Sequence, residues 1–317
     1  MLYLLSMSIC VRSPASIANL GPGFDILSMA ITEPYDVVCV ELTHGGDDSV
    51  RFIGEYSSYL PSNFRSTTIY PVVEEFRRVL GINFNVRVTI WKGIRPASGL
   101  GSSGADAAAI AYALNKLLNA GLDHKSLIRV AALGETAAAG VPHMDNVAAS
   151  LLGGLVIINP VTGDFVKVDL PSNYWVSVVI AGSKPSTREM RKLLPNAVGM
   201  NDLKNNSAYA SMLVYSLITG NREALSRALM GDSIVEPVRS KLYPHYNVVK
   251  EALLKAGAIG VALAGAGPSL FGIFDFEPAR EDIGGLLEAH GLRDYVLIIT
   301  RPSNVGVHEV PYEDLNT

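Results

Sequence analysis

The stretch Arg95-Pro-Ala-Ser-Gly-Leu-Gly-Ser-Ser-Gly104, followed at once by an alanine-rich run from Ala105 to Leu118, decides the fold of this chain. Its glycines let main-chain N–H groups approach an anion closely. The start of a helix adds unpaired N–H donors and the positive end of the helix dipole. The hydroxyls of Ser98, Ser102 and Ser103 offer further hydrogen bonds. The segment therefore predicts a phosphate-binding loop that opens a helix.

Two better-known phosphate motifs fit this loop less well. The Walker A motif needs a lysine before its Ser/Thr, and this loop contains none. Gly99, Gly101 and Gly104 match the glycine pattern of dinucleotide-binding folds, and Asp123 lies about twenty residues downstream, where an acid would bind ribose. However, Asp123 precedes the helical pattern of Lys125 to Ala139, so it is better interpreted as an N-cap.

Composition narrows the class of protein. The 317 residues are 49% hydrophobic and 18% charged, which indicates a globular protein with room for two domains. With 26 basic and 30 acidic residues, the chain predicts no nucleic-acid partner. The apolar start from Met1 to Cys10 is short and lacks a preceding basic residue, so we expect no membrane association. We expect Cys10 and Cys39 to pack as small hydrophobic residues without a bridge, in a reducing cytoplasm.

The hydrophobic pattern predicts an α+β fold. Strands are expected at residues 9–13, 35–42, 50–56, 84–91, 154–158, 165–170, 175–181 and 295–300, and as a pair that flanks residues 265–269. Helices are expected at residues 71–80, 105–118, 125–139, 187–194, 201–219, 222–230, 246–256 and 278–289. The polar segment from Gly140 to Asn146 is expected to be a loop that carries chemistry.

Three separated motifs now line up along the chain. They are Ser13-Pro-Ala-Ser-Ile-Ala-Asn-Leu-Gly-Pro-Gly-Phe-Asp25, the loop Arg95 to Ala105, and Ala264-Gly-Ala-Gly-Pro-Ser269. This trio resembles the superfamily of galactokinase, homoserine kinase, mevalonate kinase and phosphomevalonate kinase, the GHMP kinases. Within it, the chain is most similar to the homoserine kinases at Ala18 to Asp25, His143 to Asn146 and Glu236 to Arg239.

The resemblance implies a two-domain GHMP-kinase fold. Residues 1–160 would form an N-terminal, nucleotide-binding domain of the ribosomal-protein S5 domain 2 type, and residues 161–317 a ferredoxin-like C-terminal domain. The implied activity is ATP-dependent phosphorylation of the hydroxyl of L-homoserine, on the route to threonine, with Mg²⁺ as the metal and a homodimer as the assembly.

The resemblance also implies roles for individual residues. The nucleotide would contact Thr67, Arg95, Pro96, Ala97, Ser98, Gly99, Leu100, Gly101, Ser102, Ser103, Gly104 and Ala105. The metal would be held by Ser103 and Glu135, and the catalytic residues would be Asn146, Ser103 and Glu135. The substrate would contact Asn19, Asp25, His143, Asp145, Thr187, Arg191 and Arg239.

The residue types agree with these roles. Mg²⁺ prefers a few hard oxygen ligands, and Glu135 stands in an apolar helix where a carboxylate is uncommon. An amino-acid substrate carries a carboxylate and an ammonium, so its pocket should offer arginines and acids. Asp145 could act as a general base or only bind the ammonium, and we favour binding.

Alternatives and departures from the family remain. A GHMP kinase acting on mevalonate, another isoprenoid alcohol or shikimate is one alternative, although mevalonate has no ammonium to pair with the acids. A regulatory module of the same fold without catalysis is another. Thr67-Thr68 replaces the usual Asn-hydrophobic pair at the adenine side. Asp106, in the first turns of a helix that faces phosphates, would be unfavourable unless it points away.

Overall fold

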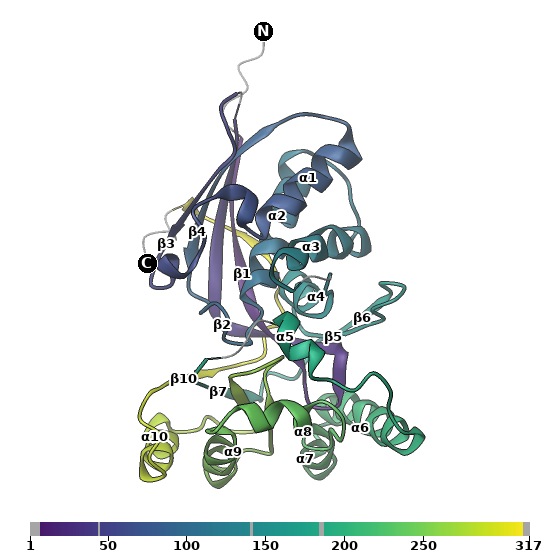
Figure 1. The fold of residues 1–317 in the computed structure, drawn as a ribbon, viewed down its shortest axis with the longest axis vertical. Helices are drawn as coiled ribbons and strands as arrows, with labels where there is room; N and C mark the ends of the chain where they lie inside the picture. Colours follow the sequence, from purple (N-terminus) through teal and green to yellow (C-terminus); the bar gives the residue numbers. More distant parts are fainter. Residues whose placement is uncertain (1–6, 44, 140–141, 184–186, 313–317) are drawn as a thin grey trace.

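The computed structural model describes residues 7–43, 45–139, 142–183 and 187–312, and within them the strands form two sheets (Figure 1). The first sheet has the order β11-β1-β2-β4-β3, and β5 and β6 continue it from the other end of β2. Its strands are β1 (Ser8–Asn19), β2 (Gly23–Thr43), β3 (Ser49–Ile53), β4 (Asn85–Lys92), β5 (Leu155–Ile158), β6 (Phe165–Val168) and β11 (His308–Val310). Only the β3–β4 pair among these described strands is parallel.

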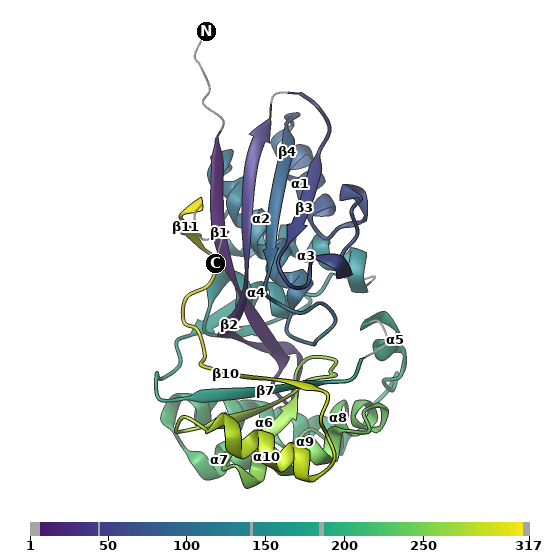
Figure 2. The same ribbon diagram turned by 90° about the vertical axis from the view of Figure 1, so that its left-hand side faces the viewer.

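Four helices cover one face of the first sheet within the described residues (Figure 2). They are α1 (Ile69–Leu80), α2 (Ser102–Leu117), α3 (His124–Ala139) and α4 (Asp145–Leu152), and the short 3₁₀ segments η1 (Ser57–Tyr59) and η2 (Phe64–Ser66) precede α1. The alanines of α2 are fully buried against sheet residues such as Val38, Val88 and Ile90. Because alanine is small, α2 can lie close to the sheet and to α3 and α4 at once.

The second sheet has the order β10-β7-β9-β8 and is antiparallel throughout. Its strands are β7 (Trp175–Ala181), β8 (Gly260–Leu263), β9 (Leu270–Phe274) and β10 (Tyr295–Thr300). The helices of this half are α5 (Thr187–Lys192), α6 (Met200–Thr219), α7 (Arg222–Leu229), α8 (Glu236–Arg239), α9 (Tyr246–Lys255) and α10 (Arg280–Ala289), with the 3₁₀ segment η3 (Ser240–Leu242). Figures 1 and 2 show α6, α7, α9 and α10 on the side of this sheet that faces away from the first sheet.

One hydrophobic cluster joins the two halves. Ile17 and Met29 of the first sheet pack with Val178 and Ile180 of β7 and with Phe271 of β9. All five side chains are almost fully buried. Burial of this kind contributes about 1.5–3 kcal/mol for each large side chain. The two sheets are therefore held together by a shared hydrophobic core.

The α+β fold, with two sheets that each have their own helices, agrees with the sequence analysis, and the expected helices and strands are present. Two segments differ. The first two strands extend much further than expected, because β1 and β2 form one long ladder with irregular register near Pro14 and Ala18. The expected loop at residues 140–146 ends at Met144, because Asp145 begins helix α4, and residues 142–144 have no regular structure. No helix in the described ranges is long and apolar enough to cross a bilayer.

The expectation for the cysteines was wrong. Cys10 and Cys39 form a disulfide. The β1–β2 register places them directly opposite each other, with their Cα atoms 4.0 Å apart, on the sheet face that the helices leave open. The positions of the two cysteines along the chain carry no information on this register, so the pairing could not be read from composition.

The boundary at residue 160 stays a prediction. The β6 strand still pairs with β5 of the first sheet, and the second sheet starts with β7. Near the end of the chain, β11 returns to pair with β1.

Candidate active site

The glycine-rich loop lies at the start of α2, with main-chain amides at its centre. Gly101 is the N-cap of α2 and has a φ of +68°. The Ala105 N–H donates to the Gly101 carbonyl over 2.8 Å. The amides of residues 102–104 come before that bond, so they have no acceptor inside the helix. This arrangement leaves a group of N–H donors at the positive end of the helix dipole, where an anion is stabilised.

Two glycines are required for the loop to pack where it does. A Cβ at Gly99, whose φ is +91°, would overlap the carbonyl oxygen of Ala264 and lie 2.8 Å from that of Gly267. A Cβ at Gly101 would overlap the Ser16 hydroxyl and lie 2.9 Å from Asn146 Oδ1. The loop therefore fits against its neighbours only without side chains at these positions.

The N-terminal motif and the motif at residues 264–269 meet this loop. The Ser269 hydroxyl donates to the Ser98 carbonyl over 2.6 Å, which fixes the loop to the residue that precedes β9. Asn19 Nδ2 donates to the Gly265 carbonyl over 2.9 Å, and the Gly265 N–H donates to the Ala18 carbonyl over 3.1 Å. The three motifs found in the sequence are thus one structural unit.

A cavity of about 370 Å³ lies against this unit. Its lining includes, from the predicted set, Asn19, Asp25, Thr67, Pro96, Ala97, Ser98, Gly99, Gly101, Ser102, Ser103, Glu135, His143, Asp145, Asn146, Arg191 and Arg239. Its lining comprises the loop, the aliphatic and hydroxyl side chains of the segment from β3 to α1, and a set of charged side chains, which we call the charged end: Asp25, His143, Asp145, Arg191 and Arg239.

The charged end is built around Asp25. Asp25, the third residue of β2, has a φ of +59°, and its N–H donates to Asn19 Oδ1 over 3.2 Å. Its carboxylate forms an ion pair with Arg191 of α5. His143 Nδ1 lies 3.2 Å from Arg191 Nη2 and 3.8 Å from Asp25 Oδ1. The Phe24 ring lies beneath both guanidinium groups of this end, with the Arg191 Cζ 5.4 Å from its centroid. Non-glycine residues in this backbone region cluster at functional sites.

Arg239, the last residue of α8, is the more deeply buried of the two arginines. Only 3% of it is exposed. Its Nη1 donates to the Gly265 carbonyl over 3.1 Å, while Nε has no hydrogen-bond partner among the described residues. Burial lowers the pKa of Arg239, and the nearby Asp25 charge acts in the opposite direction. A buried cation with an unused donor is suited to bind an anion.

Asp145 begins α4 and is 4% exposed. Burial, followed by the nearby Asp25 charge, raises its pKa to about 6, against the lowering effect of the Asn146 N–H, which donates to Asp145 Oδ1 over 2.8 Å. Burial lowers the pKa of His143, against the opposing effect of Asp25. At neutral pH the Asp145 carboxyl is therefore ionised and the His143 imidazole is neutral, beside the Asp25–Arg191 ion pair and the Arg239 guanidinium.

The residues predicted to bind Mg²⁺ are suited to that ion. Ser103 and Glu135 line the same cavity beside the loop, and together they offer a hydroxyl and a carboxylate. Mg²⁺ in phosphoryl-transfer sites is typically held by one or two such oxygens together with phosphates and water. No group of three or more His, Cys, Asp or Glu that could hold a metal occurs within the described ranges.

Some predicted residues do not line the cavity. Within the described lining, Arg95, Leu100, Gly104 and Ala105 are absent. Leu100 and Ala105 are in the hydrophobic core, and the Leu100 carbonyl accepts from the Ser16 N–H over 3.1 Å. These residues contribute backbone to the loop. Thr187 is the first residue of α5, but its side chain lies outside the described part of the chain.

Sequence reasoning also missed part of the lining. Phe24, Phe52, Leu60, Pro61, Thr68 and Asp106 belong to it. Phe24 stands inside the motif that we quoted, beside Asp25, so a cation–π role could have been considered. Asp123 is confirmed as a helix cap, since its carboxylate accepts from the Ser126 N–H over 2.8 Å.

The chain is similar to known proteins over most of its length. Residues 67–154 match the family model of the GHMP kinases N terminal domain, and residues 213–290 match that of the GHMP kinases C terminal domain. A homoserine kinase of Thermoplasma volcanium is 40% identical over 273 residues, which is 85% of each chain. One from Saccharolobus solfataricus is 41% identical and covers 83% of this chain and 85% of its own. The crystal structure of a homoserine kinase from Cytophaga hutchinsonii superposes with a TM-score of 0.86 at 31% identity, and covers 98% of this chain and 100% of that one.

Proposed function

The chain belongs to the GHMP kinases and, among them, to the homoserine kinases, and we propose how its residues divide the work of that activity. The enzyme transfers a phosphoryl group from ATP to the side-chain hydroxyl of L-homoserine, a step of threonine biosynthesis. The roles of individual residues below are our proposal, as are the use of Mg²⁺, a homodimer and a cytoplasmic location.

Our proposal for the recognition of homoserine depends on the equal numbers of acids and arginines at the charged end of the cavity. Asp25 and Asp145 offset Arg191 and Arg239, and all four line the same space. Homoserine is a zwitterion, so its carboxylate and ammonium match this balance without leaving a buried charge unpaired. Mevalonate would bring only a carboxylate. The two acids would then have no cationic partner from the substrate.

The carboxylate of homoserine would bind between Arg191 and Arg239. Arg239 is buried and has an unused Nε, while Arg191 would exchange its ion pair with Asp25 for the substrate. Asp25, once released, would join Asn19 and Asp145 around the ammonium. His143 and Thr187 would be neighbours of the bound amino acid. Substrate binding would therefore replace internal ion pairs with equivalent pairs to the substrate.

The loop would hold the polyphosphate of ATP. The amides of Ser102, Ser103 and Gly104 lack acceptors in the helix, and they point from the end of α2 that attracts anions. Asn146 Oδ1 accepts from the Ser16 hydroxyl over 2.9 Å, which leaves its NH₂ group suited to donate to a phosphoryl oxygen. Ser103 and Glu135 would hold Mg²⁺, which neutralises charge on the outer phosphates when bound.

The chemistry would consist mainly of positioning. The homoserine hydroxyl oxygen forms a bond to the γ-phosphorus, and the bond between that phosphorus and the β–γ bridging oxygen breaks, which releases ADP. The residues around the ammonium and carboxylate orient the hydroxyl toward the loop. Asp145 would serve recognition, because its carboxylate is held by the substrate ammonium and the hydroxyl proton can leave to water or phosphate without a dedicated base.

The proposed recognition of homoserine can be tested with acceptor alcohols that lack either its ammonium or its carboxylate. The chain with Mg²⁺ and ATP should convert L-homoserine to O-phospho-L-homoserine, followed by ³¹P NMR. 4-Hydroxybutyrate lacks the ammonium and 3-aminopropan-1-ol lacks the carboxylate, so each should lose about 100-fold or more in kcat/KM. Equal turnover of all three acceptors, or faster turnover of mevalonate or shikimate, would contradict the proposed charge recognition.

A further inference from the structure

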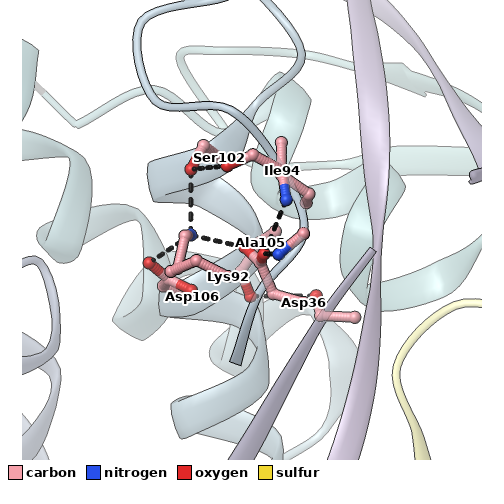
Figure 3. A network of polar contacts seen from close by, with 8 residues as sticks. Asp36, Lys92, Ile94, Ser102, Ala105 and Asp106 are labelled. Carbon is pink, nitrogen blue, oxygen red and sulfur yellow. Dashed lines mark hydrogen bonds and ion pairs between the residues drawn. The ribbon is translucent and has the colours of Figure 1, made fainter. Parts of the chain in front are cut away.

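A buried lysine lies beneath the glycine-rich loop. Lys92 is the last residue of β4 and is fully buried. Its ammonium donates to Asp36 Oδ2 over 2.5 Å, to the Ser102 hydroxyl over 2.9 Å and to Asp106 Oδ2 over 2.9 Å (Figure 3). An ammonium has three N–H donors, so these contacts use all of them. Lys92 therefore ties the central sheet to the first turns of α2.

The two acids around Lys92 differ in their second oxygens. Asp36 Oδ1 accepts from the main-chain N–H groups of Gly93 and Ile94, each over 2.9 Å. Asp106 Oδ1 is buried and has no hydrogen-bond partner among the described residues. Asp106 is 4% exposed and lines the cavity, whereas the fully buried Asp36 is not part of the described lining. Asp106 is thus the acid of this network that borders the cavity, and its Oδ1 is the oxygen left without a partner.

The network also carries more negative than positive charge. Burial, followed by the neighbouring Asp106 charge, raises the pKa of Asp36 to about 7, against the lowering effect of Lys92. One cation faces two carboxylates, so the second carboxylate is only partly offset. An ionised carboxylate oxygen can only accept hydrogen bonds. A phosphate at this point would be repelled, and a group that donates a hydrogen bond would be attracted.

The position of Asp106 indicates which part of a nucleotide it meets. It lies one helical turn after Ser102, about 6 Å further from the end of α2 that attracts phosphate. Lys92 belongs to β4, and β4 pairs with β3, where Phe52 is opposite Ile90 and lines the cavity. Leu60, Pro61, Thr67 and Thr68 continue this wall. An apolar wall with a few polar groups is typical of the part of a pocket that holds a base and sugar.

We propose that Asp106 Oδ1 accepts a hydrogen bond from the nucleoside of ATP, either from a ribose hydroxyl or from the exocyclic amino group of adenine. This inference rests on the proposed use of the loop for polyphosphate, since that places the nucleoside further along α2. Lys92 is the positioning residue: it holds Asp106 through its other oxygen and offsets its charge. The acid that was unfavourable beside phosphates thus becomes a specificity determinant for the nucleoside.

Nucleotide analogues test this proposal by binding, without catalysis. Isothermal titration with Mg²⁺ would compare ADP, 2′-deoxy-ADP, 3′-deoxy-ADP and inosine diphosphate on the unmodified chain and on Asp106→Ser. The unmodified chain should bind one analogue about tenfold more weakly than ADP, since a hydrogen bond to a charged group is lost. Asp106→Ser should weaken ADP by a similar factor and bind ADP and that analogue equally. The analogue affected identifies the donor.

A matched variant separates recognition from loss of structure. Asp36→Asn removes the other carboxylate that contacts Lys92 but leaves Asp106 in place, so discrimination among the four nucleotides should persist. Asp106→Asn, with a similar shape, serves as a second test if Asp106→Ser unfolds. Equal weakening of all four nucleotides, no weakening, or a change confined to the Mg²⁺ requirement would overturn the role of Asp106. Failure of the unmodified chain to bind ADP would instead overturn the assignment of the loop.

Discussion

The two ends of the cavity recognise their ligands in different ways. At the nucleotide end, consecutive residues of the loop and the first turn of α2 present main-chain N–H groups. At the amino-acid end, the side chains of Asp25, Asp145, Arg191 and Arg239 come from separate segments of the chain. The first end depends on local backbone conformation, and the second depends on the whole fold. We therefore expect different substitutions to damage each end.

The largest loss of activity should come from Gly101→Ala, which changes the backbone conformation at the nucleotide end. A Cβ there would overlap the Ser16 hydroxyl, and the φ of +68° is unfavourable for alanine. The loop amides would shift, and a displacement of about 1 Å can cost about 100-fold, so we expect at least that loss in kcat/KM for ATP. Steady-state kinetics with homoserine saturating would measure it.

Gly121→Ala is the matched control for this change. Gly121 has a similar φ of +65°, but nothing lies within 4 Å of the position of its Cβ. Both variants carry backbone strain, and only the first affects the loop. If the two variants lose activity equally, strain and not loop geometry explains the loss.

The next loss of activity should come from Arg239→Lys, which changes a side chain at the amino-acid end. Lysine keeps the charge but not the planar fork of donors that suits a carboxylate. We expect kcat/KM for homoserine to fall about 100-fold, because the buried site would leave the substrate carboxylate poorly paired. The KM for ATP should not change. As a control, Arg227→Lys, at an exposed position of α7, should have no effect. If Arg239→Lys raises the KM for ATP as much as the KM for homoserine, the two ends of the cavity do not bind their ligands independently.

The residues of the nucleotide end could be predicted from the sequence far more directly than those of the amino-acid end. The glycine-rich loop is a continuous segment of the sequence, and seven of its residues line the cavity: Pro96, Ala97, Ser98, Gly99, Gly101, Ser102 and Ser103. By contrast, the grouping of Asp25 with Arg191 and Arg239 came only from resemblance to a family, because residues so far apart have no local pattern that joins them. The functional roles of both sets stay predictions.

What the sequence could not predict depended on contacts between distant strands. Lys92 pairs with Asp36 of β2 and Asp106 of α2, and only the fold brings these three together. The sequence shows that an acid at Asp106 is unfavourable beside phosphates, but it does not show that Lys92 is the partner of this acid. The Cys10–Cys39 disulfide was missed for the same reason, since it follows from the register of β1 and β2. Local conformation was predictable, and pairing across the sheet was not.

A smaller effect should separate binding from base catalysis at Asp145. Asp145→Asn removes the negative charge beside the substrate ammonium, so the homoserine KM should rise about 10- to 100-fold while kcat changes little. The reaction of 4-hydroxybutyrate, which has no ammonium, should be almost unaffected. A collapse of kcat for both acceptors with unchanged KM would identify Asp145 as the general base.

The smallest effect should be a dependence on pH at the amino-acid end. The pKa of Asp145 is about 6, so its carboxylate is ionised above that pH and neutral below it. As the pH falls from 7 to 5, the ammonium loses this partner, and the homoserine KM should rise about tenfold. The Asp145→Asn variant should lack this rise. If the variant shows the same pH profile as the unmodified chain, another group is responsible.

The central claim is that the loop amides at the start of α2 hold the polyphosphate of ATP beside the homoserine hydroxyl. A crystal structure with Mg²⁺, a non-hydrolysable ATP analogue and L-homoserine tests it most directly. The predicted result is a polyphosphate hydrogen-bonded to the amides of Ser102, Ser103 and Gly104, with the homoserine carboxylate between Arg191 and Arg239. A polyphosphate bound away from the loop, or a homoserine bound away from the two arginines, would contradict it.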